Sequence, residues 1–162
     1  MRRIICYIKK WRNEKYENAS SDHSEPPSIG LTLLAIDCFV QKSTDEGDDD
    51  LFAFQQTMEA IKNRFSSSDD NDGNIVYDIA EYLPVEPRKD VFQKMRDSSS
   101  SYINTFYNRL STAVDNLTNA VNVESAHDAG VFVQKVLGDE FKAPDKEAKT
   151  AAAQNRREHS FG

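Results

Sequence analysis

The chain of 162 residues carries 20 lysines and arginines against 27 aspartates and glutamates, which gives a formal net charge of −7. Its length suits one ordinary domain or part of a larger one. No apolar run approaches the ~18–20 residues that a membrane span needs, and the N-terminus lacks the apolar stretch and cleavage site of a signal peptide. The sequence therefore predicts a soluble, cytoplasmic protein.

The apolar residues are scarce enough that they must be concentrated to form a core. Leu, Ile, Val and Phe make up about 22% of the chain, just above the roughly 20% below which highly charged chains stay disordered. The two cysteines, Cys6 and Cys38, lie in apolar helix-like segments without metal-ligand or CxxC spacing. We expect both to be small buried thiols without a disulfide.

Residues 1–15 have the pattern of an amphipathic helix, because Ile4, Ile8 and Trp11 recur on one face. The other face is basic and gives the strongest charge asymmetry in the chain. Its cations are Arg2, Arg3, Lys9, Lys10, Arg12 and Lys15, opposed by Glu14. This face is either a solvated surface or a binding surface.

A polar loop and a Pro-Pro pair precede a second predicted helix, residues 28–40. Ser28 stands where its hydroxyl could cap the free amides of the helix start. The segment is apolar almost all round, with Asp37 its only charge, so we expect it to be the central buried helix. Gly30 suggests that another element or a ligand presses against its first turn.

An acidic connector leads to a third predicted helix. Its single apolar stripe consists of Leu51, Phe54, Met58, Ile61 and Phe65. The aspartates that end the connector favour the positive end of this helix. Residues 66–74 are expected to form a solvated loop. Residues 75–87 are ambiguous, either a short helix or an extended stretch stopped by prolines.

Three further helices are predicted after Pro87. A short one carries Val91, Phe92 and Met95, and the longest runs from about 102 to 121. Its stripe comprises Tyr102, Phe106, Leu110, Ala113, Leu117 and Val121. A capping box of Ser125 and Asp128 begins the last helix, which should end near Gly138 and bury Ala126, Ala129, Val133 and Val136. The fold class is therefore all-α, a bundle of five or six helices.

Catalytic motifs are missing from the sequence. His23 and His159 lie in polar ends and His127 in a first helical turn, so none is a persuasive general base. Neither the GxxxxGK[ST] nor the GxGxxG phosphate cradle occurs. Asp48 and Asp50 could suggest a magnesium pair, but no strand holds them, which favours a helix-capping linker. We predict no catalytic and no metal-binding residue.

One phosphate-binding constellation remains. Lys9 and Lys10 with Ser28 could place ammonium groups, a hydroxyl and free helix-start amides around a polyphosphate. The alternative is a basic helix that docks on an acidic partner.

Two segments resemble the C-terminal helical lobe of bacterial cyclic-oligonucleotide synthases, relatives of oligoadenylate synthase and cyclic GMP-AMP synthase. The first, RRIICYIKKWRNEKYENASSDHSEPPSIGLTLLAIDCF, has the family's basic helix with Lys-x-Trp, a loop, and Pro-Pro before an apolar helix. The second runs from about 106 to 141 and ends in VQKVLGDEF, which is similar to the family's Gly-Asp-x-Phe closure. The resemblance covers about residues 1–144.

The resemblance implies a helical nucleotidyltransferase lobe over residues 1–142 and a flexible charged tail over 143–162. Lys9 and Ser28 would reach the triphosphate of an NTP substrate. The complete enzyme would use Mg²⁺ and NTPs to make cyclic oligonucleotide second messengers in antiphage defence. Its Gly-Ser turn and Asp-x-Asp core are not in this chain, so we expect the chain alone to bind no cofactor and to be inactive.

Two departures from the family pattern matter. Val133 stands where the closure usually has tryptophan, and Met1 falls almost at the start of the basic helix. We therefore expect a C-terminal half whose core is supplied upstream in the same chain or by a separate one. The alternative is a non-enzymatic helical module that binds a protein or nucleic acid through its first helix. The net charge of −7 disfavours broad nucleic-acid affinity.

Overall fold

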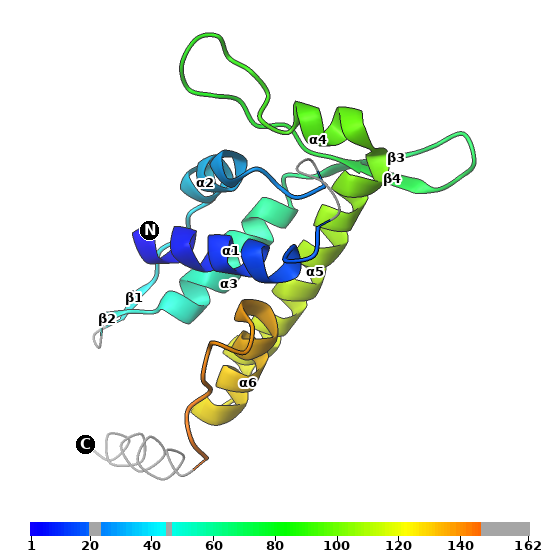
Figure 1. The fold of residues 1–162 in the computed structure, drawn as a ribbon. Coiled ribbons are helices and arrows are strands. Elements are labelled where there is room, and N and C mark those ends of the chain that lie inside the picture. The colour runs from blue at the N-terminus through cyan, green and yellow to red at the C-terminus, as the bar shows by residue number, and fades with distance from the viewer. Residues whose placement is uncertain (20–23, 45–46, 147–162) are drawn as a thin grey trace.

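The computed structural model describes residues 1–19, 24–44 and 47–146, which form a mostly helical bundle (Figure 1). Six helices lie in these ranges: α1 (Arg2–Lys15), α2 (Ser28–Asp37), α3 (Asp50–Lys62), α4 (Gln93–Ser98), α5 (Ser100–Asn122) and α6 (Ala126–Leu137). Two antiparallel strand pairs join them: β1 (Ser43–Thr44) with β2 (Gly47–Asp48), and β3 (Ser66–Asp69) with β4 (Ile75–Asp78). The predicted helical bundle is confirmed, with these two small hairpins added.

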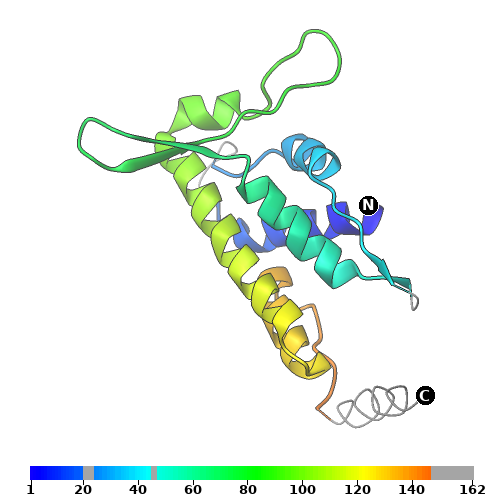
Figure 2. The same ribbon diagram turned by 180° about the vertical axis from the view of Figure 1, so that it is seen from behind.

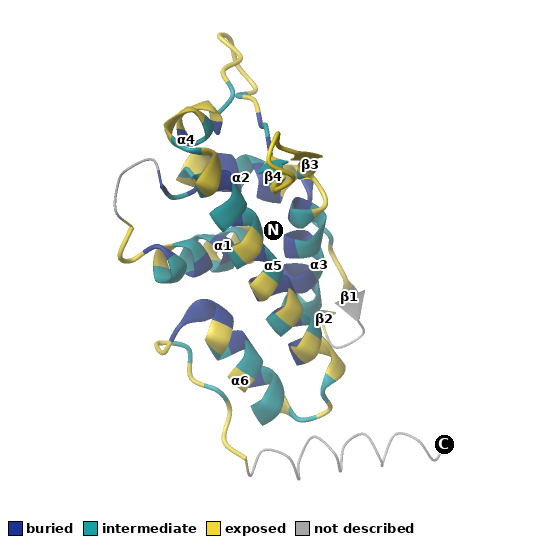
Figure 3. Ribbon diagram, turned by 90° about the vertical axis from the view of Figure 1, so that its right-hand side faces the viewer, coloured by how far each residue is buried: buried dark blue, intermediate teal, exposed yellow. Residues whose placement is uncertain are grey.

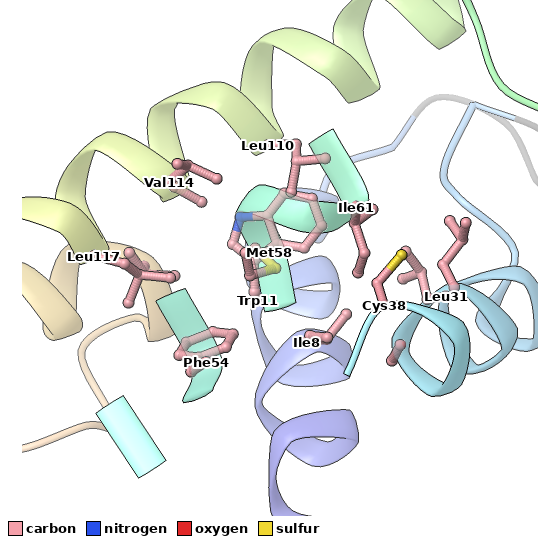
Figure 4. Packing of buried hydrophobic residues seen from close by; sticks show 14 of the residues in the cluster. Ile8, Trp11, Leu31, Cys38, Phe54, Met58, Ile61, Leu110, Val114 and Leu117 are labelled. Carbon is pink, nitrogen blue, oxygen red and sulfur yellow. The ribbon is translucent and has the colours of Figure 1, made fainter. Parts of the chain in front are cut away.

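Helix α5 is the axis of the bundle, because α3, α4, α6 and β4 all pack against it. Its buried residues are Ile103, Phe106, Leu110, Ala113, Val114, Leu117 and Ala120. The core that it shares with α1 and α3 is centred on Trp11 and Met58, both fully buried (Figure 4). The predicted stripe is wrong at its ends, since Tyr102 is half-buried and Val121 is exposed. Because α3 and α6 cover two sides of α5, the buried face is wider than one stripe.

Helix α2 is not the central helix that its apolar composition predicts. It ends at Asp37 and packs against α1 and α3, and part of it is coloured as exposed (Figure 3). Ile29 is 50% exposed and Ile36 is 45% exposed. The prediction for residues 28–40 is therefore wrong in both extent and position. A uniformly apolar helix shows that burial is favourable but not which faces find partners.

The start of α2 differs from the prediction in the same way. Pro27 occupies the N-cap position and no side chain caps the helix, so Ser28 is the first helical residue rather than its cap. Gly30 is approached by another element, since a Cβ built there would lie 2.7 Å from Cζ of Phe92. The glycine therefore allows the segment before α4 to pack against α2.

Helix α3 begins as the acidic connector predicts. The Asp49 carboxylate accepts a hydrogen bond of 3.0 Å from the amide of Phe52, which caps the helix start. Phe65 lies beyond the last helical residue, yet its ring still packs edge-on against Phe106. The apolar stripe of the third predicted helix is thus confirmed, although the helix itself is shorter.

Residues 66–78 form a hairpin where a solvated loop was expected at 66–74. Ser66 pairs with Asp78 and Asp69 with Ile75, and the hairpin extends away from one end of α5 (Figure 2). At its tip the Asp70 carboxylate accepts hydrogen bonds from the amides of Asp72 and Asn74. These bonds lower the pKa of Asp70. The ambiguous segment that starts at Ile75 is therefore extended at its beginning.

Helix α6 begins at the predicted cap, because the Ser125 hydroxyl accepts from the Asp128 amide at 3.3 Å. Its C-cap is Gly138, as predicted, and the φ of +86° at this residue suits glycine. Ala126 is exposed and Ala129 half-buried, so the predicted buried set is correct only at its two valines.

The chain after α6 turns back along this helix. A Cβ built on Gly130 would lie 2.6 Å from Cδ of Pro144, so residues 143–144 pack closely on α6. Residues 143–146 of the predicted tail are described, and the remainder of that tail lies outside the described residues.

The predicted burial of the cysteines holds for only one of them. Cys38 is buried, and burial raises the pKa of its thiol, whereas Cys6 is exposed on α1. Within residues 1–19, 24–44 and 47–146, no helix is both long enough and apolar enough to cross a membrane.

Candidate functional site

The basic face of α1 is largely neutralised by carboxylates from other parts of the fold. Arg3 Nε lies 2.9 Å from an Asp50 oxygen, and Arg12 Nη2 lies 2.6 Å from a Glu25 oxygen. Lys10 pairs with Glu140 beyond α6, and this pairing raises the pKa of Lys10 while it lowers that of Glu140. Arg3, Lys10 and Arg12 are thus paired, which reduces the positive charge that the sequence gives to this helix.

Lys9 differs from these paired cations. It is half-buried and forms no ion pair with any residue that the structure describes. Arg12, one turn further along the same face, donates from Nε to the Pro26 carbonyl at 3.2 Å. Because residues i and i+3 lie on the same helix face, Lys9 shares a face of α1 with the arginine that bonds to the segment before α2.

The start of α2 offers free hydrogen-bonding groups. Ser28 is exposed, and its carbonyl accepts from the Thr32 hydroxyl at 2.8 Å. The first helical hydrogen bond runs from the Leu31 amide to the Pro27 carbonyl, so the amides of Ser28 and Ile29 have no partner among the described residues. The structure thus places Lys9 and Ser28 on adjoining helices, while Lys10 is directed toward Glu140 instead.

The acidic run before α3 has structural partners. Asp49 caps the helix, and Asp50 accepts from the Tyr7 hydroxyl at 3.3 Å beside its ion pair with Arg3. Burial and the nearby Asp50 charge raise the pKa of Tyr7. Among the described residues, no group of three or more His, Cys, Asp or Glu side chains could hold a metal ion.

The histidines add little to the site. His127 Nδ1 hydrogen bonds with the Pro144 carbonyl, which ties α6 to the returning chain. His23 and His159 lie outside the described residues.

Two hollows in the bundle were not predicted. One of about 390 Å³ is an apolar groove between α1, α3, α6 and the chain after α6, with Phe54, Leu137 and Phe141 in its lining. The other, about 210 Å³, lies between α1, α5 and α6 and is lined by Lys15, Arg109, Thr112, Asn116 and Lys135. Neither gives a local sequence motif, because the lining residues are far apart along the chain.

No protein-family model and no curated protein matches the chain. The motifs that carry its resemblance nevertheless have definite structural places. Lys-x-Trp lies in α1 with Trp11 fully buried, Pro-Pro precedes α2, and Gly138 lets the chain turn beside the Glu14 carboxylate.

Proposed function

We propose that the chain is the helical, substrate-binding part of a nucleotidyltransferase that makes cyclic oligonucleotide second messengers from NTPs in antiphage defence. The observation that carries this proposal is Lys9, which has no ion-pair partner among the described residues and lies one turn before Arg12, the residue that bonds next to the uncapped start of α2. An ammonium group, a hydroxyl and free helix-start amides are the groups that bind phosphate oxygens.

The charges around Lys9 and the start of α2 favour binding of a polyphosphate. The Arg12 and Glu25 charges cancel each other, whereas Lys9 and the positive end of the α2 dipole each contribute positive charge. The exposed Ile29 and Ile36 of α2 lie on the same helix. An apolar helix face of this kind is suited to packing against a further domain, which in the proposal is the catalytic core.

Catalysis in this proposal belongs to a core supplied upstream in the same chain or by a separate chain. The core would carry the carboxylates that hold Mg²⁺ for attack of a ribose hydroxyl on an α-phosphate. Asp49 and Asp50 of this chain instead cap α3 and bind Tyr7 and Arg3. Incubation of the chain alone with ATP, GTP and Mg²⁺ should yield no oligonucleotide.

The test is calorimetric titration of the chain with ATP. Lys9→Ala and Ser28→Ala should each weaken binding, by about tenfold for the lysine, as expected for loss of a charge-assisted hydrogen bond. Lys94→Ala, an exposed lysine of α4, is the matched control and should leave the affinity unchanged. An unchanged affinity in both Lys9→Ala and Ser28→Ala would contradict the proposal.

The rival hypothesis is a non-enzymatic module that binds an acidic protein or a nucleic acid through α1. It has less support because Arg3, Lys10 and Arg12 already have carboxylate partners. A response to Lys9→Ala alone that disappears as salt is raised, with Ser28→Ala unchanged, would favour this rival.

A further inference from the structure

The smaller cavity gathers three cations from three helices. Lys15 is the last residue of α1, Arg109 lies in α5, and Lys135 lies in the last turn of α6. No carboxylate is among the residues that line it, although the whole chain has a net charge of −7. The Glu14 carboxylate lies against Gly138 and does not line the cavity. This is a local concentration of positive charge in an acidic protein.

Carbonyl oxygens and aromatic rings, rather than carboxylates, hold these cations. Lys15 Nζ donates to the Lys135 carbonyl at 2.8 Å, and Arg109 Nη1 donates to the Lys15 carbonyl at 2.5 Å. The Arg109 guanidinium also lies 4.2 Å above the Tyr16 ring. Lys135 Nζ lies 4.8 Å above the Phe132 ring. These contacts fix the three groups but cancel little of their charge.

The helix ends that attract these cations do not neutralise them. The carbonyl end of a helix carries about half an elementary negative charge. The ends of α1 and α6 together therefore offset about one of the three positive charges. A net charge of about +2 remains, which matches a phosphate group, because phosphomonoesters carry about −1.5 to −2 at pH 7.

The number of remaining donors also favours phosphate over a carboxylate. Lys15 and Arg109 each use one donor in the bonds above, while Asn116 Nδ2 donates to the Thr112 carbonyl at 2.8 Å and retains a second N–H. A carboxylate has two oxygens, and a bidentate arginine engages both of them. Phosphate has more oxygens and can engage arginine, lysine and amide donors together.

We propose that this cavity is a binding site for the phosphate group of a small ligand, either inorganic phosphate or a small phosphomonoester. Its volume of about 210 Å³ lies below the roughly 300–1,000 Å³ of pockets for drug-sized molecules. The site is separate from the one proposed for the NTP, because Lys9 and Ser28 do not line it.

The test is an NMR titration of the full chain with sodium phosphate, with sodium acetate at equal ionic strength as the reference. Phosphate should give saturable shifts at the side-chain amide of Asn116 and at Arg109 Nε–H, and acetate should not. Equal responses to the two anions, or shifts that never saturate, would overturn the proposal. A parallel titration with glycerol phosphate identifies the source: tighter binding than inorganic phosphate indicates an organic ligand, and weaker binding indicates the free ion.

Variants separate this site from the one proposed for the NTP. Lys135→Ala changes an exposed side chain and should fold normally while it weakens phosphate binding about tenfold or more, as loss of one charge-assisted contact predicts. Lys94→Ala should leave the phosphate-dependent shifts at Asn116 and Arg109 unchanged, since Lys94 does not line the cavity. Full affinity in Lys135→Ala, or an equal loss in Lys94→Ala, would contradict the site. The ATP titrations of Lys9→Ala and Ser28→Ala are independent of either result.

Discussion

Two groups of cations around α1 differ in what holds them. Arg3, Lys10 and Arg12 each meet a carboxylate from another part of the chain. Lys15 meets a main-chain carbonyl instead, and with Arg109 and Lys135 it lines a cavity. A carboxylate cancels a full charge, whereas a helix end cancels about half of one. Cations held by carbonyls therefore keep more of their charge than those paired with carboxylates.

The comparison depends on α1 being anchored by Trp11, which lies on this helix between Lys10 and Arg12. Trp11 is fully buried, and its ring centroid is 6.3 Å from that of Phe106. Trp11→Ala should lower the free energy of unfolding by about 3–5 kcal/mol, the usual cost of such a truncation. Urea unfolding followed by circular dichroism measures this, since the variant lacks the chain's one tryptophan.

The control for this prediction is Cys6→Ala on the exposed side of the same helix. It should change the free energy of unfolding by less than about 0.5 kcal/mol. A loss below about 1 kcal/mol for Trp11→Ala would mean that α1 is not fixed by its burial, and the two groups would then have no fixed positions to compare.

Within the carboxylate-paired group, the stability lost when a pair is broken should be larger for the more buried pair. The Arg12 and Glu25 side chains are 20% and 27% exposed, and Arg12 also bonds to the Pro26 carbonyl. Arg12→Ala should cost about 1–3 kcal/mol, because a partly buried charge-assisted hydrogen bond is lost. Lys10→Ala breaks an exposed pair and should cause a smaller loss that vanishes at high salt. Urea unfolding at low and high salt measures both, and equal losses would contradict the distinction.

The cavity group can be tested through Tyr16, whose ring lies beneath the Arg109 guanidinium. Burial raises the Tyr16 pKa to about 12, and the Arg109 charge opposes that rise. Because the folded state holds this proton more tightly than the unfolded chain, stability should be unchanged below pH about 10 and should fall as pH rises from about 10 toward 12. Arg109→Leu should raise the Tyr16 pKa further.

Absorbance titration of tyrosinate in the native chain, in Tyr16→Phe and in Arg109→Leu measures this change. Tyr16→Phe identifies which of the six tyrosines titrates last. A Tyr16 pKa that falls in Arg109→Leu would mean that the guanidinium charge does not act on this ring.

The helices with a single clear stripe or a capping residue could be predicted from the sequence. The caps at Asp49 and Ser125 and the buried face of α1 are where their patterns place them. The position of α2 could not be predicted, because apolar composition does not say how many neighbours cover a helix. The β3–β4 hairpin was not predicted because neither strand has the alternation of apolar and polar residues that marks a half-buried strand. None of the residues in the two strands is buried.

The two candidate sites also differ in how far the sequence predicts them. Lys9 and Ser28 stand beside recognisable motifs, and their helices do pack together. The cavity of Lys15, Arg109 and Lys135 could not be found in this way, since its hydrogen bonds join residues 94 and 120 positions apart. Only the packing of α6 against both α1 and α5 brings these cations together.

Asn104 of α5 gives the exposed hairpin a property of its own. Its side-chain amide donates to the Ile75 carbonyl at 3.1 Å and accepts from the Tyr77 amide at 2.8 Å. It thereby occupies the edge of β4 that faces away from β3, as the peptide group of a third strand would. The opposite edge, β3, consists of three serines and an aspartate. One edge is thus closed and the other is polar, so the hairpin offers little to strands of other chains and is protected from edge-to-edge aggregation.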